Sequence, residues 1–549
     1  MTSIKNSNLN NRLYITLLLV FGFFLILPLI DTKIIPGHDY VFHITRILDV
    51  AEALKCGIFP VRMYVDSIQF WGTPVGIFYP SLFNYFPAIL SLFGLPIEIC
   101  YNIYIALIIF SGLFASWCGF TLLTRSKQIG FYSTLLYISS GYYLTDTYIR
   151  NALGESMALS FMPLSIACIN AFFDKRKLPI KLYILGILSI SAVIESHVLS
   201  SIFLVLYGLI YLLSHSKKIS SKIIKRITLI LIALLLLNAT FIVPFLIFYR
   251  EVPLTIHFIE EFAQSGWTPI ILLRFIVFWN FWLFTAIYFF FSTKIHSPSL
   301  FYANKLKIYS FYFKNFIIGV VFLFISSSVF PWDFLWPIKN VLKTMQFSWR
   351  FLGISTLFFC ICGGFGLNIL VKKIRTISII VIVLVIGISK IAAFSYLTPK
   401  PFWTLYEKCY WERIVFSTDE DYLYKNMNIK ELFEQKNRFI TDAKITNWTK
   451  KITNISFSYS SQSDSKIILP LVNYPGYIAL NQANQLVQIQ ENDNHMISIS
   501  LPKGTGSFKV HYEGLPAFKY ADYISLLSLM LLVFCIFIID KKSMWKKLL

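Results

Sequence analysis

The sequence predicts a polytopic α-helical membrane protein, and three observations support this prediction. Hydrophobic residues make up 56% of the 549 residues and charged residues only 14%, a balance that a soluble chain of this length does not have. Apolar runs of about 17 to 25 residues, the length that a helix needs to cross a bilayer, recur along the chain. Lysine and arginine gather in short loops between these runs, so membrane topology explains the net charge of +21 better than nucleic-acid binding does.

About twelve spans are predicted. The first, residues 13–30, follows a polar tail that carries Lys5 and Arg12 and lacks a small-residue cleavage site, so we expect an uncleaved anchor with a cytoplasmic N-terminus. The second covers about 97–123, which leaves 31–96 as an outer loop. The remaining spans are expected near 129–146, 157–173, 181–195, 198–213, 227–249, 269–291, 313–330, 351–371, 377–395 and 522–539. Every alternate loop is then basic, and both termini are cytoplasmic.

The two short spans at 181–195 and 198–213 meet at Glu195-Ser196-His197 and leave an alternative open. One long tilted helix over both would reverse the side of every later loop and place the basic clusters outside. The two-span interpretation keeps all basic loops on one side and is therefore preferred.

The chain divides into a transmembrane core at 1–395, an extracytoplasmic domain at 396–521 and a final span with a basic tail at 522–549. The middle segment is richer in Asn, Gln and Ser and contains short alternating runs at 466–469, 486–489, 496–499 and 508–512. Turn signals such as Pro475-Gly476 separate these runs, which indicates a small β-rich domain.

The eight cysteines show no CxxC spacing, so neither a zinc site nor a disulfide framework is indicated. No close acidic pair in the sequence demands a divalent metal, and no cofactor is predicted.

Ionisable residues are costly near a bilayer, and here they gather in the predicted outer loops. A helix entered at Pro36-Gly37 would place Asp39, His43 and Arg46 along one face. These residues are candidates for chemistry, but Asp39 would also serve as an N-cap while His43 and Arg46 contact lipid headgroups.

Three further groups are candidates on the same side. Arg150 and Glu155 suit phosphate and hydroxyl recognition, although a local ion pair at a helix end is an equal alternative. His197 lies at the tight junction of two spans, where a carbonyl partner would also satisfy it. Trp349 and Arg350 precede a span, where both residue types commonly anchor a helix at the membrane interface.

Taken together, these motifs resemble a known class. The Gly-His-Asp-Tyr-x-Phe-His-x-x-Arg setting of Asp39 in a long first outer loop is similar to the GT-C membrane glycosyltransferases. More narrowly, the chain resembles the bacterial membrane proteins related to 6-pyruvoyl-tetrahydropterin synthase and the YfhO-like proteins. The shared features are Asp39 with His43 and Arg46, the aromatic loop at 71–80, Arg150 with Glu155, His197, 346–350 and 473–477. Tyr477 and Ser348 depart from the pattern, in which Trp and Pro are expected.

The resemblance implies transfer of a sugar from a polyprenyl-phosphate carrier to a cell-envelope glycan or glycolipid at the outer face of the cell membrane. By the same analogy Asp39 is the general base, because a carboxylate that takes the acceptor's proton makes the hydroxyl a better nucleophile. Arg150, Arg350 and Arg46 would neutralise the departing phosphate. His43 and His197 would donate hydrogen bonds, and Glu155 would position a partner.

Two other functions stay open. A transporter or flippase of lipid-linked saccharides would place charges at mid-membrane beside broken helices. A non-catalytic envelope-assembly protein would act through its β-rich domain.

Overall fold

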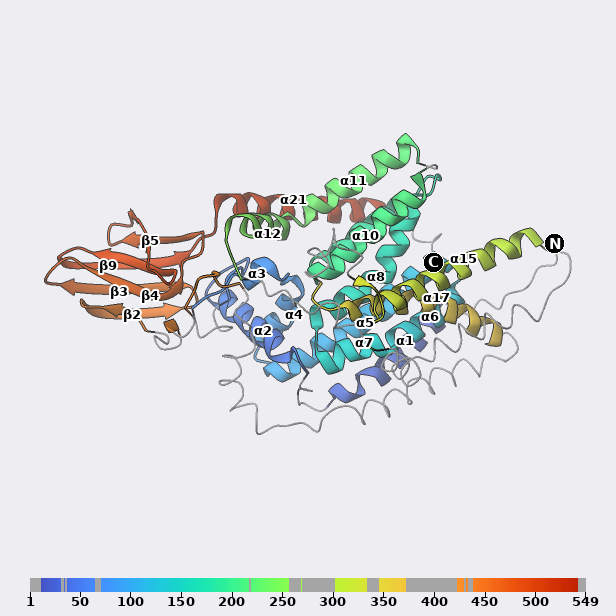
Figure 1. Cartoon of the computed structure of the whole chain (residues 1–549), viewed down its shortest axis with the longest axis horizontal. Coiled ribbons are helices and arrows are strands. Elements are labelled where there is room, and N and C mark those ends of the chain that lie inside the picture. The colour runs from blue at the N-terminus through green and yellow to red at the C-terminus, as the bar shows by residue number, and fades with distance from the viewer. Residues whose placement is uncertain are drawn as a thin grey trace.

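The computed structural model describes residues 11–30, 34, 37–64, 71–216, 219–255, 268, 302–332, 345–371, 422–428, 431–432 and 438–541. A helical body and a β-domain of residues 438–512 lie at opposite ends of the long axis (Figure 1). The spans expected at 269–291 and 377–395 lie outside the described residues.

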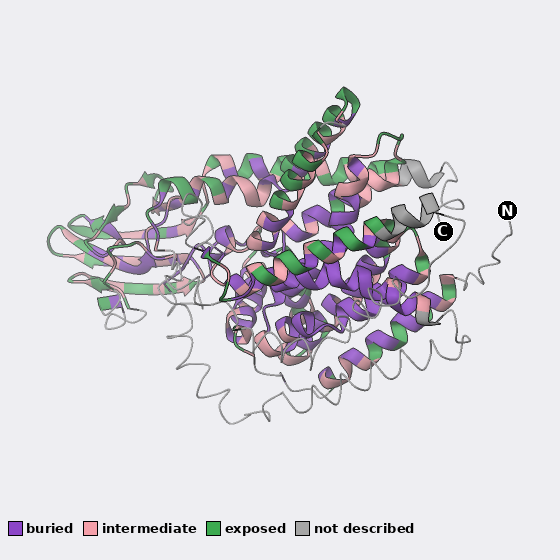
Figure 2. Ribbon diagram, turned by 45° about the vertical axis from the view of Figure 1, so that its right-hand side comes forward, coloured by how far each residue is buried: buried purple, intermediate pink, exposed green. Residues whose placement is uncertain are grey.

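The helices follow the chain in this order: α1 (Asn11–Ile26), η1 (Leu27–Leu29), α2 (Tyr40–Lys55), α3 (Val75–Phe78), η2 (Leu82–Asn84), α4 (Tyr85–Leu92), α5 (Ile97–Thr124), α6 (Lys127–Ile138), α7 (Gly141–Leu144), η3 (Thr145–Arg150), α8 (Leu153–Phe172), α9 (Ile180–Ile194), α10 (Val198–Ser214), α11 (Ser221–Leu237), α12 (Ala239–Glu251), α15 (Tyr302–Ile325), η6 (Ser348–Arg350), α17 (Phe351–Val371) and α21 (Pro516–Lys541). The buried residues concentrate where α5, α6, α8 and α17 pack together (Figure 2).

In the described part of the chain, five helical segments are long and apolar enough to cross a membrane, or six if one bent pair counts as a span. They are Asn11–Leu29, Ile97–Thr124, Leu153–Phe172, Ser348–Ile369 and Pro516–Ile536. Leu527, Leu531 and Phe534 of α21 are exposed, as expected for side chains that face lipid. The chain is therefore a multi-pass membrane protein, while the predicted number of twelve spans is not confirmed.

The span predicted over 227–249 is formed by two helices and not by one continuous helix. α11 and α12 meet at Asn238 with a bend of 78°. The Asn238 side chain donates hydrogen bonds to Ser191 Oγ (2.9 Å) and Leu234 O (2.7 Å), and the Thr240 backbone amide donates to Ser525 Oγ. These polar partners satisfy the backbone and side-chain groups that a break in an apolar run would otherwise leave unpaired.

The span predicted over 129–146 is also interrupted. α6 ends at Ile138, and Ser140 caps the short α7 by accepting a hydrogen bond from the Tyr143 amide. Residues 129–138 are all buried because α6 packs between α5 and α17. This segment therefore lies inside the helical body and does not face lipid. At 180–214, by contrast, the structure contains two separate helices, α9 and α10, and the single long helix is not formed.

The β-domain consists of two antiparallel sheets with strand orders β1-β4-β8-β7 and β2-β3-β9-β5-β6. The strands are β1 (Ile440–Thr441), β2 (Lys444–Lys451), β3 (Asn454–Ser461), β4 (Ser465–Val472), β5 (Tyr477–Asn481), β6 (Leu486–Val487), β7 (Gln490–Glu491), β8 (Met496–Leu501) and β9 (Gly504–Tyr512). Strands occur in all four predicted runs, although only half of 486–489 belongs to β6.

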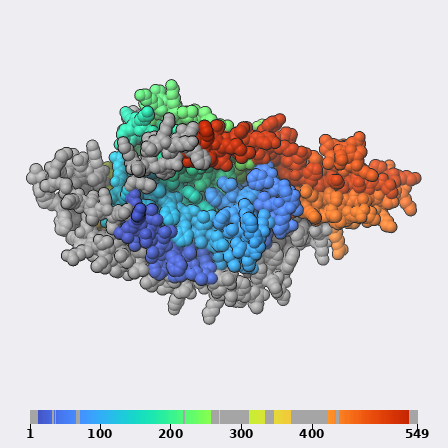
Figure 3. All heavy atoms as spheres, turned by 180° about the vertical axis from the view of Figure 1, so that it is seen from behind, coloured from blue at the N-terminus to red at the C-terminus, as the bar shows by residue number. Residues whose placement is uncertain are grey.

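The β-domain joins the helical body through a second hydrophobic core. Trp71, Phe78 and Phe248 from the helical part pack in the same cluster as Tyr474 and Ile499. The Val472 amide donates to Trp71 O at 3.0 Å, which ties the segment before α3 to β4. From β9 the chain continues into α21, which lies at the surface beside the helical body (red, Figure 3).

Candidate functional site

One turn of irregular helix gathers the charged residues of the candidate site. η3 is a π-helical turn that ends at Arg150, and the next residue, Asn151, has a φ of 56°. Such turns widen the helix by one residue and occur frequently at functional sites. The backbone amides of His38 and Asp39 donate to Ile149 O (3.2 Å) and Arg150 O (2.7 Å), so the segment before α2 is held against the end of η3.

Arg150 is the centre of this arrangement. Its guanidinium group contacts the carboxylates of Asp146, Glu155 (3.0 Å) and Asp39 (3.7 Å). Burial alone lowers the pKa of Arg150, but Asp146 and Glu155 more than offset this, so the pKa lies above its ordinary value. Arg150 therefore stays charged and fixes three carboxylates that come from different elements.

A second guanidinium group completes the cluster. Arg350 Nε lies 3.5 Å from Glu155 Oε2, while its terminal nitrogens donate to Met345 O and to Gln346 Oε1 (2.9 Å). The neighbouring residue Trp349 contacts Arg150: its ring centroid lies 4.6 Å from the Arg150 guanidinium carbon. Tyr142 donates to Glu155 Oε1 at 2.7 Å. We call Asp39, Asp146, Arg150, Glu155 and Arg350 the charged cluster; fully ionised, it has three carboxylates against two guanidinium groups.

Asp39 is the accessible acid of the charged cluster. Its side chain is 42% exposed, whereas those of Asp146 and Glu155 are 1% and 5% exposed. It precedes α2 but makes no side-chain capping hydrogen bond, so the capping alternative is not seen. Burial raises the pKa of the Asp39 carboxyl, and the positive charges of Arg150 and Arg350 oppose this effect. A carboxylate with a raised pKa is a stronger base than an ordinary aspartate.

His43 and His197 lie around Tyr79, next to the charged cluster. Their ring centroids are 6.0 Å and 5.9 Å from that of Tyr79. Burial and the adjacent Arg46 lower the pKa of His43 well below its ordinary value, so this imidazole is neutral. His197 Nδ1 lies 2.9 Å from Ser200 Oγ, which provides a local hydrogen-bond partner.

Arg46 is turned away from the carboxylates. It donates to Tyr79 O (3.1 Å), Pro80 O (2.7 Å) and Ser81 Oγ (3.3 Å), and its guanidinium carbon lies 4.2 Å from the Tyr79 ring centroid. These contacts hold the 79–81 loop in place. The structure thus brings Asp39, Arg150, Glu155 and Arg350 together and places Arg46 in a neighbouring, structural position.

Asp146 and Tyr142 were not predicted from the sequence, and Tyr79 was predicted only as part of the aromatic loop at 71–80. Asp146 had a recognisable signal, since it lies four residues before Arg150 on what reads as a helix. No spacing rule marks Tyr142 or Tyr79, because each contacts its partner through the fold. Within the described ranges, no group of three or more His, Cys, Asp or Glu side chains is arranged to hold a metal ion.

No protein-family model matches the chain, and no curated protein matches it. The solved structures that are similar in part include the following two. One is the mycobacterial arabinofuranosyltransferase AftD, at 16% identity, with 72% of this chain and 27% of that chain covered and a TM-score of 0.44. The other is ArnT from Cupriavidus metallidurans bound to undecaprenyl phosphate, at 14% identity, with 65% and 58% covered and a TM-score of 0.33. The chain thus spans 27% to 58% of the lengths of these structures.

Proposed function

We propose that this protein is a GT-C-type membrane glycosyltransferase that moves a sugar from a polyprenyl-phosphate donor to an envelope glycan or glycolipid on the outer face of the membrane. One observation carries the proposal: a half-exposed carboxylate, Asp39, lies 3.7 Å from the guanidinium group of Arg150, which is otherwise enclosed by protein. This pairing places a base beside a fixed positive charge, the two groups that transfer from a phosphate donor needs.

In the proposed reaction, the acceptor hydroxyl attacks the anomeric carbon while its proton passes to Asp39. The bond between that carbon and the phosphate oxygen breaks, and the electron pair leaves with the lipid phosphate. Protonation of Asp39 removes its attraction for Arg150, so the positive charge of Arg150 becomes available as the phosphate becomes more negative. The stabilisation is therefore greatest in the transition state, which is where it accelerates the reaction.

The remaining cluster residues act on Arg150 and Arg350. Asp146 and Glu155 hold the guanidinium groups in one orientation, and Tyr142 fixes Glu155. His43 and His197, which pack against Tyr79, have the proposed role of donating hydrogen bonds to a sugar hydroxyl.

The test is Asp39→Asn, compared with wild type for envelope glycan composition and for release of polyprenyl phosphate. Asparagine keeps the shape of the side chain but cannot accept the proton, so we expect a loss of about 10²- to 10⁴-fold in transfer. Asp493→Asn, an exposed acid in the β-domain, is the matched control. Unchanged glycans in a well-expressed Asp39→Asn protein would remove Asp39 as the base. Delivery of a lipid-linked saccharide without release of the carrier phosphate would instead favour a flippase.

A further inference from the structure

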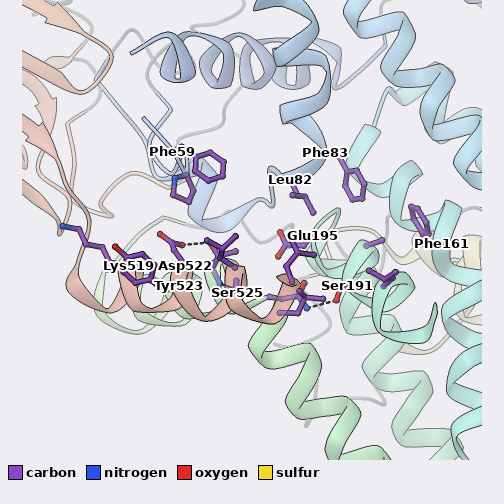
Figure 4. A pocket seen from close by; sticks show the side chains of 18 residues that line it. Phe59, Leu82, Phe83, Phe161, Ser191, Glu195, Lys519, Asp522, Tyr523 and Ser525 are labelled. Carbon is purple, nitrogen blue, oxygen red and sulfur yellow. Dashed lines mark hydrogen bonds between the residues drawn. The ribbon is translucent and has the colours of Figure 1, made fainter. Parts of the chain in front are cut away.

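A cavity of about 770 Å³ lies outside the charged cluster. Side chains of α8, α9, α21, η2, the α11–α12 junction and the segment after α2 surround it (Figure 4). Its lining is mainly apolar and includes Phe59, Leu82, Phe161, Leu188, Leu526 and Leu529. None of the five residues of the charged cluster lines it. This is a space of the size and character that takes a hydrocarbon chain.

Most polar groups on the wall already have partners. Asp522 Oδ1 accepts hydrogen bonds from Arg62 (2.5 Å) and Thr240 Oγ1 (2.6 Å). Lys519 pairs with Glu513 at 2.5 Å, and Asn238 donates to Ser191 Oγ at 2.9 Å. The two charged residues Asp522 and Lys519 are therefore each compensated by a neighbour of opposite sign.

Glu195, unlike Asp522 and Lys519, is not compensated by a neighbour of opposite charge in the described part of the chain. It follows the last residue of α9 and is only 9% exposed. Its backbone amide donates to Ser191 O, but among the described residues its carboxylate has neither a hydrogen bond nor an ion pair. Figure 4 shows Glu195 between Leu82 and Ser191 on the wall of the cavity. Burial raises the pKa of this carboxyl group to about 8, so without a partner it holds a proton at neutral pH, and a ligand that supplies an ammonium donor would stabilise its ionised form.

We propose that this cavity binds an amphiphile whose ammonium head pairs with Glu195 and whose hydrocarbon tail lies along the apolar lining. The ammonium group follows from the charge balance, since Glu195 is the uncompensated acid among the described wall residues. The tail follows from the leucine and phenylalanine side chains around it. The proposal concerns binding alone and does not depend on sugar transfer.

The experiment measures binding of dodecylammonium to the full chain, purified in dodecyl maltoside, by isothermal titration calorimetry. Dodecanol has the same tail without the charge, and dodecyl sulfate has the opposite charge. We expect saturable binding of dodecylammonium to wild type, at least about tenfold weaker binding to Glu195→Gln, and no saturable binding of the two other probes. Glu52→Gln, which removes an exposed acid of α2, should bind as wild type does.

A cavity-filling variant tests the tail separately. Leu188→Trp replaces a leucine of the cavity wall by the larger indole side chain. It should weaken dodecylammonium binding although Glu195 is kept. Glutamine has nearly the same size as the protonated glutamic acid that it replaces, so Glu195→Gln should fold about as well as wild type. Equal binding of dodecylammonium to wild type and Glu195→Gln, or equal binding of dodecanol and dodecylammonium to wild type, would overturn the proposal.

Discussion

At the residue scale, the exposure of each carboxylate in the charged cluster separates structural from chemical roles. Asp146 and Glu155 are almost completely enclosed and contact guanidinium groups, whereas Asp39 reaches solvent beside the same Arg150. Removal of a buried partner leaves a buried charge uncompensated. Removal of Asp39, by contrast, leaves Arg150 with two carboxylates. Loss of Asp146 or Glu155 should therefore lower the stability of the protein, whereas loss of Asp39 should mainly lower its activity.

The first prediction concerns stability. Arg150→Ala leaves Asp146 and Glu155 buried and under-compensated, so we expect a loss of about 3 to 5 kcal/mol. Asp39→Asn removes one partly exposed partner, so its effect should stay below about 1 kcal/mol. Thermal unfolding of the two variants in the same detergent measures the contrast. Similar unfolding temperatures for both variants would mean that Arg150 does not organise the cluster.

The second prediction concerns pH. Because Asp39 must be ionised to act as a base and burial raises its pKa, activity should fall with decreasing pH at a value above the ordinary aspartate range near 4. Arg350 lowers the Asp39 pKa, so Arg350→Gln should move this acid limb to still higher pH. Arg350→Lys keeps the charge and serves as the control. The measurement is the transfer rate of each variant as a function of pH. An acid limb at the same pH in Arg350→Gln and Arg350→Lys would argue against Asp39 as the titrating group.

The part of the charged cluster that could be predicted from the sequence is the part formed by residues close together in the chain. Arg150 and Glu155 are close in sequence, so their ion pair is a local feature that spacing can predict. Asp39 reaches Arg150 only because residues 38–39 bond to the end of η3, a long-range contact that no periodicity encodes. Arg46 shares a helix with His43, yet backbone carbonyls of the 79–81 loop are its partners. A helical face therefore predicts which residues are neighbours but not what they contact.

At the element scale, close packing around η3 and α8 requires a small side chain. A Cβ at Gly154 would lie 2.4 Å from the Tyr79 hydroxyl and 2.7 Å from Ser196 O. The Ser196 carbonyl is backbone next to His197 and cannot easily move aside. Gly154 thus allows α8, the 79–81 loop and the α9–α10 junction to meet beside the charged cluster.

The third prediction follows from this contact. Gly154→Ala should destabilise the protein by about 1 to 3 kcal/mol, because the added methyl group displaces Tyr79 or the junction. Gly208 in α10 has no atom within 4 Å of an added Cβ, so Gly208→Ala should be neutral or stabilise by up to about 1 kcal/mol. Unfolding temperatures of both variants test the contrast. An unchanged temperature for Gly154→Ala would show that the three elements do not pack as described.

Helix breaks were the least predictable elements. Hydropathy shows that 227–249 is apolar, but the bend at Asn238 depends on Ser191 and Ser525, which come from two other helices. The β-domain shows the same limit. Strands β4, β8 and β9 contain apolar runs and were recognised, whereas β2 is polar and partly exposed and owes its place to pairing with β3. The hydrophobic pattern of a sequence reveals elements that bury their own apolar residues. It does not reveal elements whose position depends on contacts with neighbouring strands or helices.

At the scale of the whole molecule, the second hydrophobic core limits how the β-domain can be arranged. Trp71, from the segment between the first two predicted spans, and Phe248 of α12 share this core with the β-domain. Asp39 belongs to the same segment, 31–96, as Trp71, so the β-domain and the charged cluster should lie on one side of the membrane. Residues 174–179, between α8 and α9, follow the far end of α8 and should lie on the other side.

The fourth prediction tests this arrangement by cysteine labelling. Ser463→Cys places a thiol in the exposed β3–β4 turn, and Lys177→Cys places one in the exposed loop between α8 and α9. A membrane-impermeant maleimide should label Ser463→Cys in intact cells but label Lys177→Cys only after permeabilisation, relative to the wild-type background of native cysteines. Basic residues at 175–177 favour the cytoplasmic side for the second position. The reverse pattern would put the β-domain, and with it Asp39, on the cytoplasmic side, where a donor exposed at the outer face could not reach the base.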